Sequence, residues 1–286
     1  MRGSARGSGF STACAGWKNR EMPTAREVPL LNHSLEEASA FTASELTANV
    51  RQMRGLASVA VPPLCILEFD GDLTDWLVAE GKARVFAEWP CFHTPMFTMD
   101  VEGVTCGIVP RTIGGPFAVL IAEQLAACGV EWIVGLTSAG RVSPELPLPC
   151  LVVADEAVRD EGTSLHYLPP CETVKCSGSG VELEKELRKT DWAVRRGKVW
   201  TTDAPYRETE TQLRHWAREG VLAVEMQAAS LFAFGVAKAV PVACVAMVSN
   251  AVDHDGKQFD TGSQKDGLRV VEGIARAFLA CRPVRR

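Results

Sequence analysis

The segment GVLAVEMQAASLFAFG, residues 220–235, places polar side chains in an otherwise apolar run. Glu225 and Gln227 stand two positions apart, with Met226 between them. Residues two apart share a face on a strand but not on a helix, and a strand-to-helix junction at about Met226 fits both patterns. Burying a carboxylate without a partner is costly. Glu225 is therefore either an acid turned outward from a core helix or part of a site at such a junction.

Two acids near residue 70 are also placed to do chemistry. Asp72 and Asp75 belong to DGDLTD, residues 70–75, which follows the apolar run PPLCILEF. Asp72 fits a turn acid, and Asp75 fits an acid at a helix N-terminus, where the dipole favours it. Either carboxylate could instead orient a water molecule and remove its proton.

Further polar clusters follow one predicted strand after another. In an open α/β sheet, ligands bind at the carboxyl ends of strands, so these clusters predict one site better than scattered turns do. The clusters are RTIGG (111–115), TSAG (137–140), RDEGTSLHY (159–167), TTDAPYRET (201–209), EMQ (225–227) and SNAVDHD (249–255).

The alternation of apolar runs and periodic segments predicts an α/β fold. Strands are expected at 62–69, 150–160 and 241–253, a hairpin around Glu102-Gly103, and helices at 115–128, 208–220 and 267–282. The basic, Gly/Ser-rich residues 1–22 are expected to form a disordered tail. Residues 23–60 are expected to pack on the core or on a partner subunit, and residues 61–286 to form one α/β domain.

Composition excludes several classes of protein. The chain of 286 residues is 47% hydrophobic and carries a net charge of −5, which gives no electrostatic reason to bind nucleic acid. No apolar run has the length of a membrane span. The ten cysteines form no C-x-x-C pair, so we expect free thiols, a cytoplasmic protein and no metal site.

Three motifs, GLTSAG, VWTTDAPYRET and GVLAVEMQAASLF, together with LVVADEAVRDEGTSLHYLPP, resemble the nucleoside phosphorylase-I superfamily. The resemblance is strongest to its uridine phosphorylase branch and runs from about Cys65 to Ala280 in the same order. It implies a three-layer α/β/α sandwich around a distorted mixed sheet. It also implies cleavage of the N-glycosidic bond of a nucleoside without an organic cofactor, and homodimers or larger oligomers built from dimers.

The resemblance assigns roles at the nucleoside site. The ribose is expected on Glu225, Met226 and Gln227, where the family has a second glutamate in place of Gln227. An amide accepts at one end, donates at the other and carries no charge. His33 is either a surface histidine or one that a partner subunit contributes to the ribose. Tyr206, Arg207 and Thr137 are expected at the base.

The phosphate site departs from the family pattern. Gly71 and Ser138 match groups that contact phosphate, but Asp75 stands at an arginine position, and the family's other arginines have no counterpart. Arg111 is the candidate that would restore a cation, and Thr112 is expected at the same phosphate or water site. In the hydrolytic branch, which TSAG also resembles, a carboxylate of the first loop activates water, a role open to Asp72 or Asp75.

The leaving base raises a separate question. Asn250 stands where purine-cleaving members carry an acid that protonates the base, and an amide cannot donate a proton in that way. Asp253, three residues later in the sequence, is the candidate that could protonate the base in place of Asn250.

Three functions stay open at this point. The chain is a nucleoside hydrolase, a phosphorylase that uses inorganic phosphate as co-substrate through Arg111, or a non-catalytic nucleoside- or base-binding relative. The missing arginines favour the hydrolase, because a phosphate dianion in a cleft needs compensating positive charge.

Overall fold

The computed structural model describes residues 28–177, 180–249 and 263–281. It divides into two compact units, Met1–Ser34 and Leu35–Arg286. The described part of the first unit holds one short 3-10 helix, η3 (Pro29–Leu31). Residues 1–22, predicted to be a tail, lie outside the described residues.

The second unit is built on one mixed sheet of eleven strands. The strand order is β2-β3-β4-β1-β5-β11-β7-β9-β10-β6, with β8 paired to β7. The central strands β4, β1, β5 and β11 are parallel, whereas β7 runs antiparallel to β11 and parallel to β9. The strands are β1 (Leu64–Glu68), β2 (Arg84–Val85), β3 (Phe97–Val101), β4 (Val104–Pro110), β5 (Trp132–Ser138), β6 (Gly140–Arg141), β7 (Cys150–Asp160), β8 (Thr173–Lys175), β9 (Ala193–Thr202), β10 (Val221–Glu225) and β11 (Val242–Val248).

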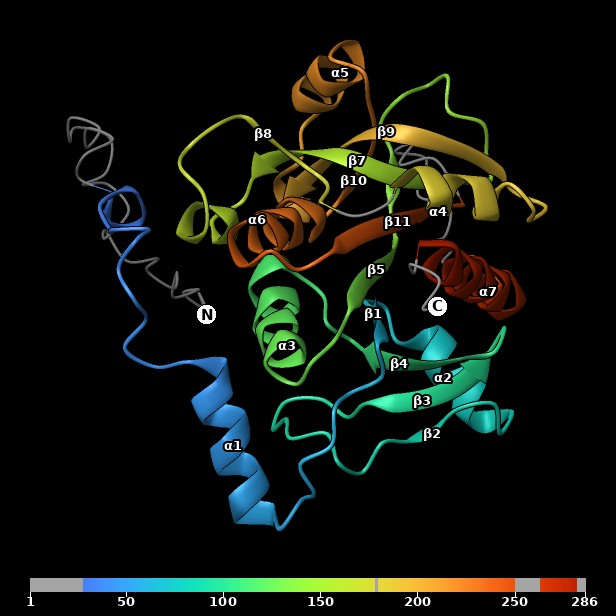
Figure 1. Cartoon of the computed structure of the whole chain (residues 1–286). Helices are drawn as coiled ribbons and strands as arrows, with labels where there is room; N and C mark the ends of the chain where they lie inside the picture. The colour runs from blue at the N-terminus through green and yellow to red at the C-terminus, as the bar shows by residue number, and fades with distance from the viewer. Residues whose placement is uncertain (1–27, 178–179, 250–262, 282–286) are drawn as a thin grey trace, which may run out of the picture. The chain divides into compact units, whose positions relative to one another are not determined.

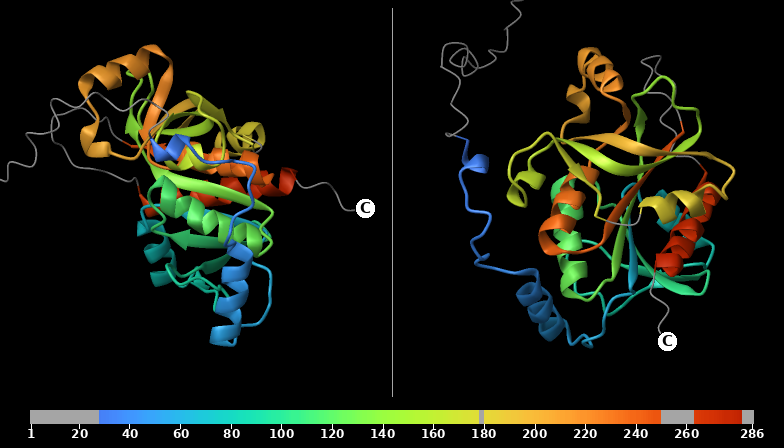
Figure 2. Two further views of the ribbon diagram at one scale, coloured as in Figure 1. Left: turned by 90° about the vertical axis from the view of Figure 1, so that its left-hand side faces the viewer. Right: turned by 45° about the horizontal axis from the view of Figure 1, so that its top comes forward.

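Helices cover both faces of this sheet, as Figures 1 and 2 show, with α3 beside α6 on one face and α4 beside α7 on the other. The side chains of β1 alternate accordingly: Cys65 and Leu67 pack in the cluster with α3 and α6, and Leu64 and Ile66 in the cluster with α4 and α7. The helices are α1 (Ala43–Arg54), α2 (Asp72–Ala79), α3 (Gly115–Ala127), α4 (Gly180–Leu187), α5 (Glu210–Arg218), α6 (Ala228–Lys238) and α7 (Gln264–Cys281). These layers confirm the predicted α/β/α fold class.

The two-residue strand β6 joins distant parts of the sheet. It follows β5 after a single residue and pairs antiparallel with β10, Val224 lying opposite Gly140. Backbone bonds from Val142 and Ser143 to the Leu222 carbonyl extend this pairing. As a result, the end of β5 lies against the end of β10, although the sheet order separates the two strands by three others.

Most predicted elements are present with small shifts of their ends. The hairpin turns at Glu102-Gly103, and the predicted junction at Met226 lies between the last residue of β10 and the first of α6. Helix α1 belongs to the same compact unit as the sheet, within the segment predicted to be an N-terminal extension. Its Arg51 donates to the Val59 carbonyl and contacts the Cys128 sulfur.

Among the described helices, none combines the length and the apolarity that a bilayer crossing requires. All nine cysteines in the described part of the chain are free, and six of them are buried. Burial raises the pKa of the Cys106 thiol to about 12, so this thiol is protonated and unreactive at neutral pH.

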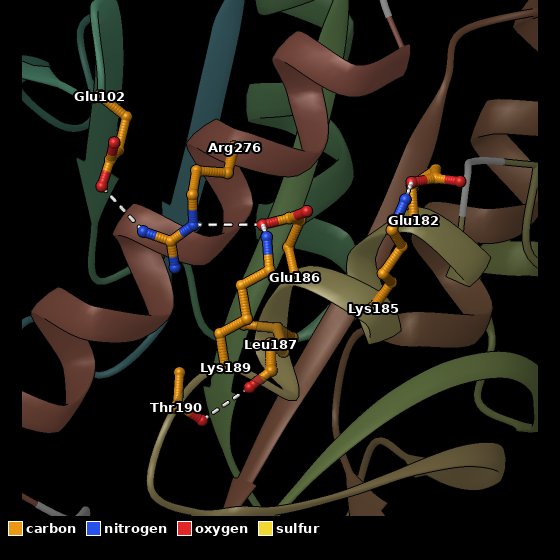
Figure 3. Close-up of polar contacts among 8 residues, drawn as sticks. All are labelled: Glu102, Glu182, Lys185, Glu186, Leu187, Lys189, Thr190 and Arg276. Carbon is orange, nitrogen blue, oxygen red and sulfur yellow. Dashed lines mark hydrogen bonds and ion pairs between the residues drawn. The ribbon is translucent and has the colours of Figure 1, made fainter.

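Arg276 of α7 links three elements, as Figure 3 shows. Its Nη1 lies 2.8 Å from a carboxylate oxygen of Glu102 in the β3–β4 turn. Its Nε lies 3.2 Å from the carboxylate of Glu186 in α4. The Glu186 side chain is only 8% exposed and also binds Lys189 at 2.5 Å, so Arg276 is one of two cations that pair with a nearly buried carboxylate.

We predict that Arg276→Met lowers the free energy of unfolding by about 1–2 kcal/mol, because it leaves the Glu186 carboxylate with one partner. The matched control is Lys185→Met in the same helix α4, whose ion pair with Glu182 is more exposed. That change is expected to cost less than about 0.5 kcal/mol. Urea denaturation measures both values, and equal costs for the two variants would contradict the assignment.

Candidate active site

The Glu225 carboxylate holds the junction between β10 and α6. One oxygen accepts hydrogen bonds from the backbone N–H groups of Gln227 at 2.6 Å and Ala228 at 2.8 Å. The other accepts from the Thr201 hydroxyl of β9 at 2.5 Å, and that hydroxyl accepts from the Ala229 N–H. These groups satisfy the first N–H donors of α6, which have no partner within the helix. The partner of the buried acid is therefore the helix itself.

The side-chain amide of Gln227 contacts the adjacent backbone through its oxygen. It is 1% exposed, and its Oε1 accepts from the Met226 N–H at 3.1 Å. Its Nε2 makes no hydrogen bond with another residue in the described part of the chain.

A cleft of about 430 Å³ lies where the ends of β5 and β10 meet. A volume of this size fits a small ligand such as a nucleoside. Its lining comes from the β1 end, the β5–β6 junction, the 3-10 helix η5 (Pro205–Arg207) and the β10–α6 junction. The lining residues are Asp70, Ile113, Thr137, Ser138, Ala139, Gly140, Pro205, Tyr206, Glu208, Val224, Glu225, Met226 and Gln227.

Asp70 lies in the first loop, between the end of β1 and the start of α2, and its side chain lines this cleft. Its carboxylate accepts from the Ser138 backbone N–H at 3.0 Å and from the Ser138 hydroxyl at 3.1 Å. Burial raises the pKa of Asp70, and the two hydrogen bonds from Ser138 lower it. Each carboxylate oxygen keeps lone pairs free to accept from a further donor in the cleft.

A smaller cavity of about 30 Å³ shares Asp70, Thr137 and Ser138 with the cleft. It is also lined by Asp72 and by residues at the start of α7. This volume suits one water molecule, for which Asp70, Asp72 and Ser138 offer polar partners.

A second buried acid, Glu68, holds the backbone of the first loop through hydrogen bonds. Glu68, the last residue of β1, is 4% exposed. Its carboxylate accepts from the Gly71 N–H at 2.7 Å and from the backbone and hydroxyl of Thr74 at 3.2 and 2.8 Å. The hydrogen-bond donors of Gly71 and Thr74, at the start of α2, are therefore already paired with Glu68.

Arg111 is turned away from the cleft. Its guanidinium forms an ion pair with Asp75, and the two side chains are 55% and 61% exposed. The arginine side chain crosses Gly71, where an added Cβ would lie 2.6 Å from the Arg111 Cγ. Gly71, with φ of +95°, thus permits the close approach, and Arg111 itself adopts a left-handed φ of +58°.

Of the three residues predicted to contact the base, two line the cleft and one does not. Thr137 and Tyr206 line the cleft, and the Tyr206 side chain is fully exposed at its edge. Arg207 is exposed and lines neither cavity. Glu208, which follows it, does line the cleft and is half-buried.

The structure therefore brings together Thr137, Ser138, Glu225, Met226, Gln227 and Tyr206. Asp72 lines the smaller cavity only. Gly71, Asp75, Arg111 and Thr112 line neither, because Glu68 holds the loop backbone, Asp75 and Arg111 hold each other, and Thr112 is wholly buried beside Ile113.

Three predicted residues are not placed at this cleft. His33 belongs to the compact unit Met1–Ser34, and its role at a ribose stays a prediction. Asn250 and Asp253 lie outside the described residues. Within the ranges described, no group of three or more His, Cys, Asp or Glu side chains is arranged to hold a metal ion.

Sequence reasoning missed Asp70 and Glu208. Asp70 directly follows the apolar run of β1, which is the position that the strand-end rule favours. Glu208 lies inside the TTDAPYRET motif, between the two base candidates and the start of α5.

The model of the phosphorylase superfamily matches residues 63–280, which is most of the chain and nearly all of the second unit. The chain belongs to the phosphorylase superfamily. The match covers every strand of the sheet and both junctions that form the cleft.

Relatives within the phosphorylase superfamily confirm the resemblance to the uridine phosphorylase branch. A uridine phosphorylase of Salmonella typhimurium is 23% identical over 82% of this chain and 96% of its own. A guanosine phosphorylase of Halorubrum lacusprofundi is 27% identical over 57% of this chain and 68% of its own. The crystal structure of uridine phosphorylase from Vibrio fischeri superposes with a TM-score of 0.61 at 24% identity, covering 79% of this chain and 92% of that one.

We predict that the stability of this superfamily member falls as pH rises from about 4.5 to 7 because of Glu225. Burial raises the pKa of Glu225 to about 7 in the folded state, from an ordinary value of 4.5. The unfolded chain therefore releases this proton first, and deprotonation favours unfolding until both states are ionised. At about 1.4 kcal/mol per pKa unit, the loss is about 2–4 kcal/mol.

Glu225→Gln is the variant that isolates this contribution, since its amide retains one oxygen for the α6 donors. We expect urea denaturation at pH 5 and pH 8 to show a smaller difference in the variant than in the wild type. An unchanged difference would mean that Glu225 is ionised throughout this range.

Proposed function

We propose that this protein hydrolyses the N-glycosidic bond of a nucleoside, with water rather than phosphate as the acceptor. The observation that carries the proposal is that carboxylates of the chain itself engage three of the four residues predicted at the phosphate site, the exception being the buried Thr112. Ser138 donates to Asp70, the Gly71 N–H donates to Glu68, and Arg111 pairs with Asp75.

Phosphate binding would have to displace these carboxylates. Hydrogen bonds to charged groups contribute about 1.5–3 kcal/mol each. Losing three of them raises a dissociation constant by about three powers of ten or more, since about 1.4 kcal/mol is tenfold. Asp70 also adds negative charge to the cleft, which repels a dianion.

Water needs an acceptor rather than a cation, and Asp70 supplies one. The small cavity beside the cleft places room for one water against Asp70 and Ser138. In the proposed reaction the water oxygen forms a bond to the sugar C1′ while the C1′–N bond breaks. Asp70 takes the proton that the water loses, and the base leaves with the bonding electron pair.

The sugar is proposed to lie on Met226 and Gln227. The Gln227 Nε2, which has no partner among the described residues, would donate to a sugar hydroxyl. Because an amide brings no charge, the negative charge that stabilises an oxocarbenium-like sugar comes from Asp70. Glu225 supports this site indirectly through the backbone that carries both residues.

We expect base release from a panel of nucleosides to proceed in phosphate-free buffer, with the free sugar as product. Added phosphate is expected to leave the rate unchanged. Asp70→Asn should lower kcat by about 10²–10⁴, the usual contribution of a general base. Asp75→Asn should retain most of the activity, because Asp75 lines neither cavity.

Two results would overturn this proposal. Base release that saturates with phosphate, yields the sugar 1-phosphate and is lost in Arg111→Ala would identify a phosphorylase. Tight binding of a nucleoside by calorimetry without turnover would identify a binding protein.

We also propose that the protein forms at least a dimer, as the family resemblance implies. Large apolar side chains are exposed on and near α1: Phe41 is 61% exposed, Met53 74% and Phe92 48%. A partner subunit covering them would remove this apolar area from water. Light scattering is expected to give at least twice the 30.9 kDa mass of the chain, and a monodisperse monomer would contradict it.

A further inference from the structure

We propose that Glu208 is the acid that protonates the leaving base, an inference that rests on the proposed nucleoside cleavage. It applies to nucleosides whose base carries an acceptor, a ring nitrogen or a carbonyl oxygen, within reach of the cleft wall that holds Glu208. The resemblance to purine-cleaving members places such an acid at Asn250, which cannot serve because it is an amide.

Glu208 is positioned by two short structures that surround it. It ends the 3-10 helix η5, and its N–H bonds to the Pro205 carbonyl at 3.3 Å. Thr209, the next residue, begins α5 with a capping box in which its hydroxyl and the Gln212 side chain satisfy each other's backbone. The backbone at Glu208 is therefore held on both sides while its side chain lines the cleft.

Other acids of the same segment are already engaged. The Asp203 carboxylate accepts from the Gly162 N–H at 2.9 Å, and Glu210 pairs with Arg214 at 2.9 Å. The Glu208 carboxyl makes no hydrogen bond and no ion pair with any residue that the structure describes. A half-buried carboxyl group without a partner costs stability, which a functional role explains.

The protonation state of Glu208 suits an acid near neutral pH. Burial raises the pKa of Glu208 to about 7. A general acid works best when its pKa lies near the operating pH, because a protonated fraction is then present with a strong tendency to donate. Among the described residues, the other titratable groups that line this cleft are Asp70, Tyr206 and Glu225, and Asp253 lies outside the described residues. Glu225 is occupied by α6, and Asp70 is the proposed base.

In the proposed reaction, Glu208 and Asp70 each carry out one proton transfer. As the C1′–N bond breaks, the Glu208 carboxyl donates its proton to the base, which leaves neutral. Asp70 gains the proton that the attacking water loses. Exchange with solvent then returns Glu208 to its protonated form and Asp70 to its ionised form, so the sum is nucleoside and water giving sugar and base.

The test compares two leaving groups in the wild type and two variants. A nucleoside base leaves poorly as an anion and needs a proton, whereas p-nitrophenolate in a p-nitrophenyl riboside leaves without one. Glu208→Gln is expected to lower kcat about 10²–10⁴-fold on the nucleoside and less than about threefold on the nitrophenyl riboside. Asp70→Asn should slow both substrates, since both need activated water.

Glu210→Gln is the matched control in the same segment, because Glu210 is exposed and faces Arg214 rather than the cleft. It should leave both rates unchanged. A second measurement uses the wild type alone: kcat on the nucleoside should fall as pH rises above about 7, where Glu208 loses its proton. The nitrophenyl riboside should not show this fall.

Two outcomes overturn the proposal in distinguishable ways. If the wild type is active and Glu208→Gln slows both substrates equally, Glu208 is not the acid, and the proposed function stands. If the wild type cleaves no nucleoside with or without phosphate, the proposed function fails and this inference fails with it.

Discussion

The hydrogen bonds of the Glu225 carboxylate are the interaction on which the site depends. They join the end of β10, the neighbouring strand β9 through Thr201, and the first turn of α6. Without them the donors at the start of α6 would be buried and unpaired. Because Met226 and Gln227 form the link between strand and helix, their positions in the cleft follow from this network. Glu225, predicted at the ribose, lines the cleft and also holds its neighbours in place through these hydrogen bonds.

The second constraint is topological. Strand β6 carries the chain from the end of β5 to the end of β10, and the cleft lies at that crossing. Groups that are 87 positions apart in the sequence, such as Gly140 and Gln227, then line one cleft. The first loop reaches the same place because β1 is hydrogen-bonded to β5, so Asp70 follows β1 at the level of Ser138. These two strand pairings therefore bring the residues of the cleft together.

The sequence was sufficient for the layers of the fold and for the strand–helix junction at Met226. Both depend on local patterns: apolar runs, turn glycines and the change from a two-residue to a helical period. The assignment of acids was less successful. Which of Asp70, Asp72 and Asp75 faces the cleft depends on contacts made through space, with Ser138 and Arg111, that no local pattern contains. Glu208 was missed for the related reason that an unpartnered acid is recognisable only once every neighbour is placed.

The pairing of Gly71, Ser138 and Arg111 with three separate acids has a consequence for divergence within the family. Glu68, Asp70 and Asp75 are paired with Gly71, Ser138 and Arg111 respectively, so removing any one acid frees only one of these three residues and leaves the other two paired. If the proposed function holds, a single substitution would therefore not restore a phosphate site, and the intermediate variants would hold unpaired donors without a ligand. Under the same proposal, several coordinated substitutions would separate a water-using site from a phosphate-using one, and gradual divergence in either direction would pass through sequences that serve neither.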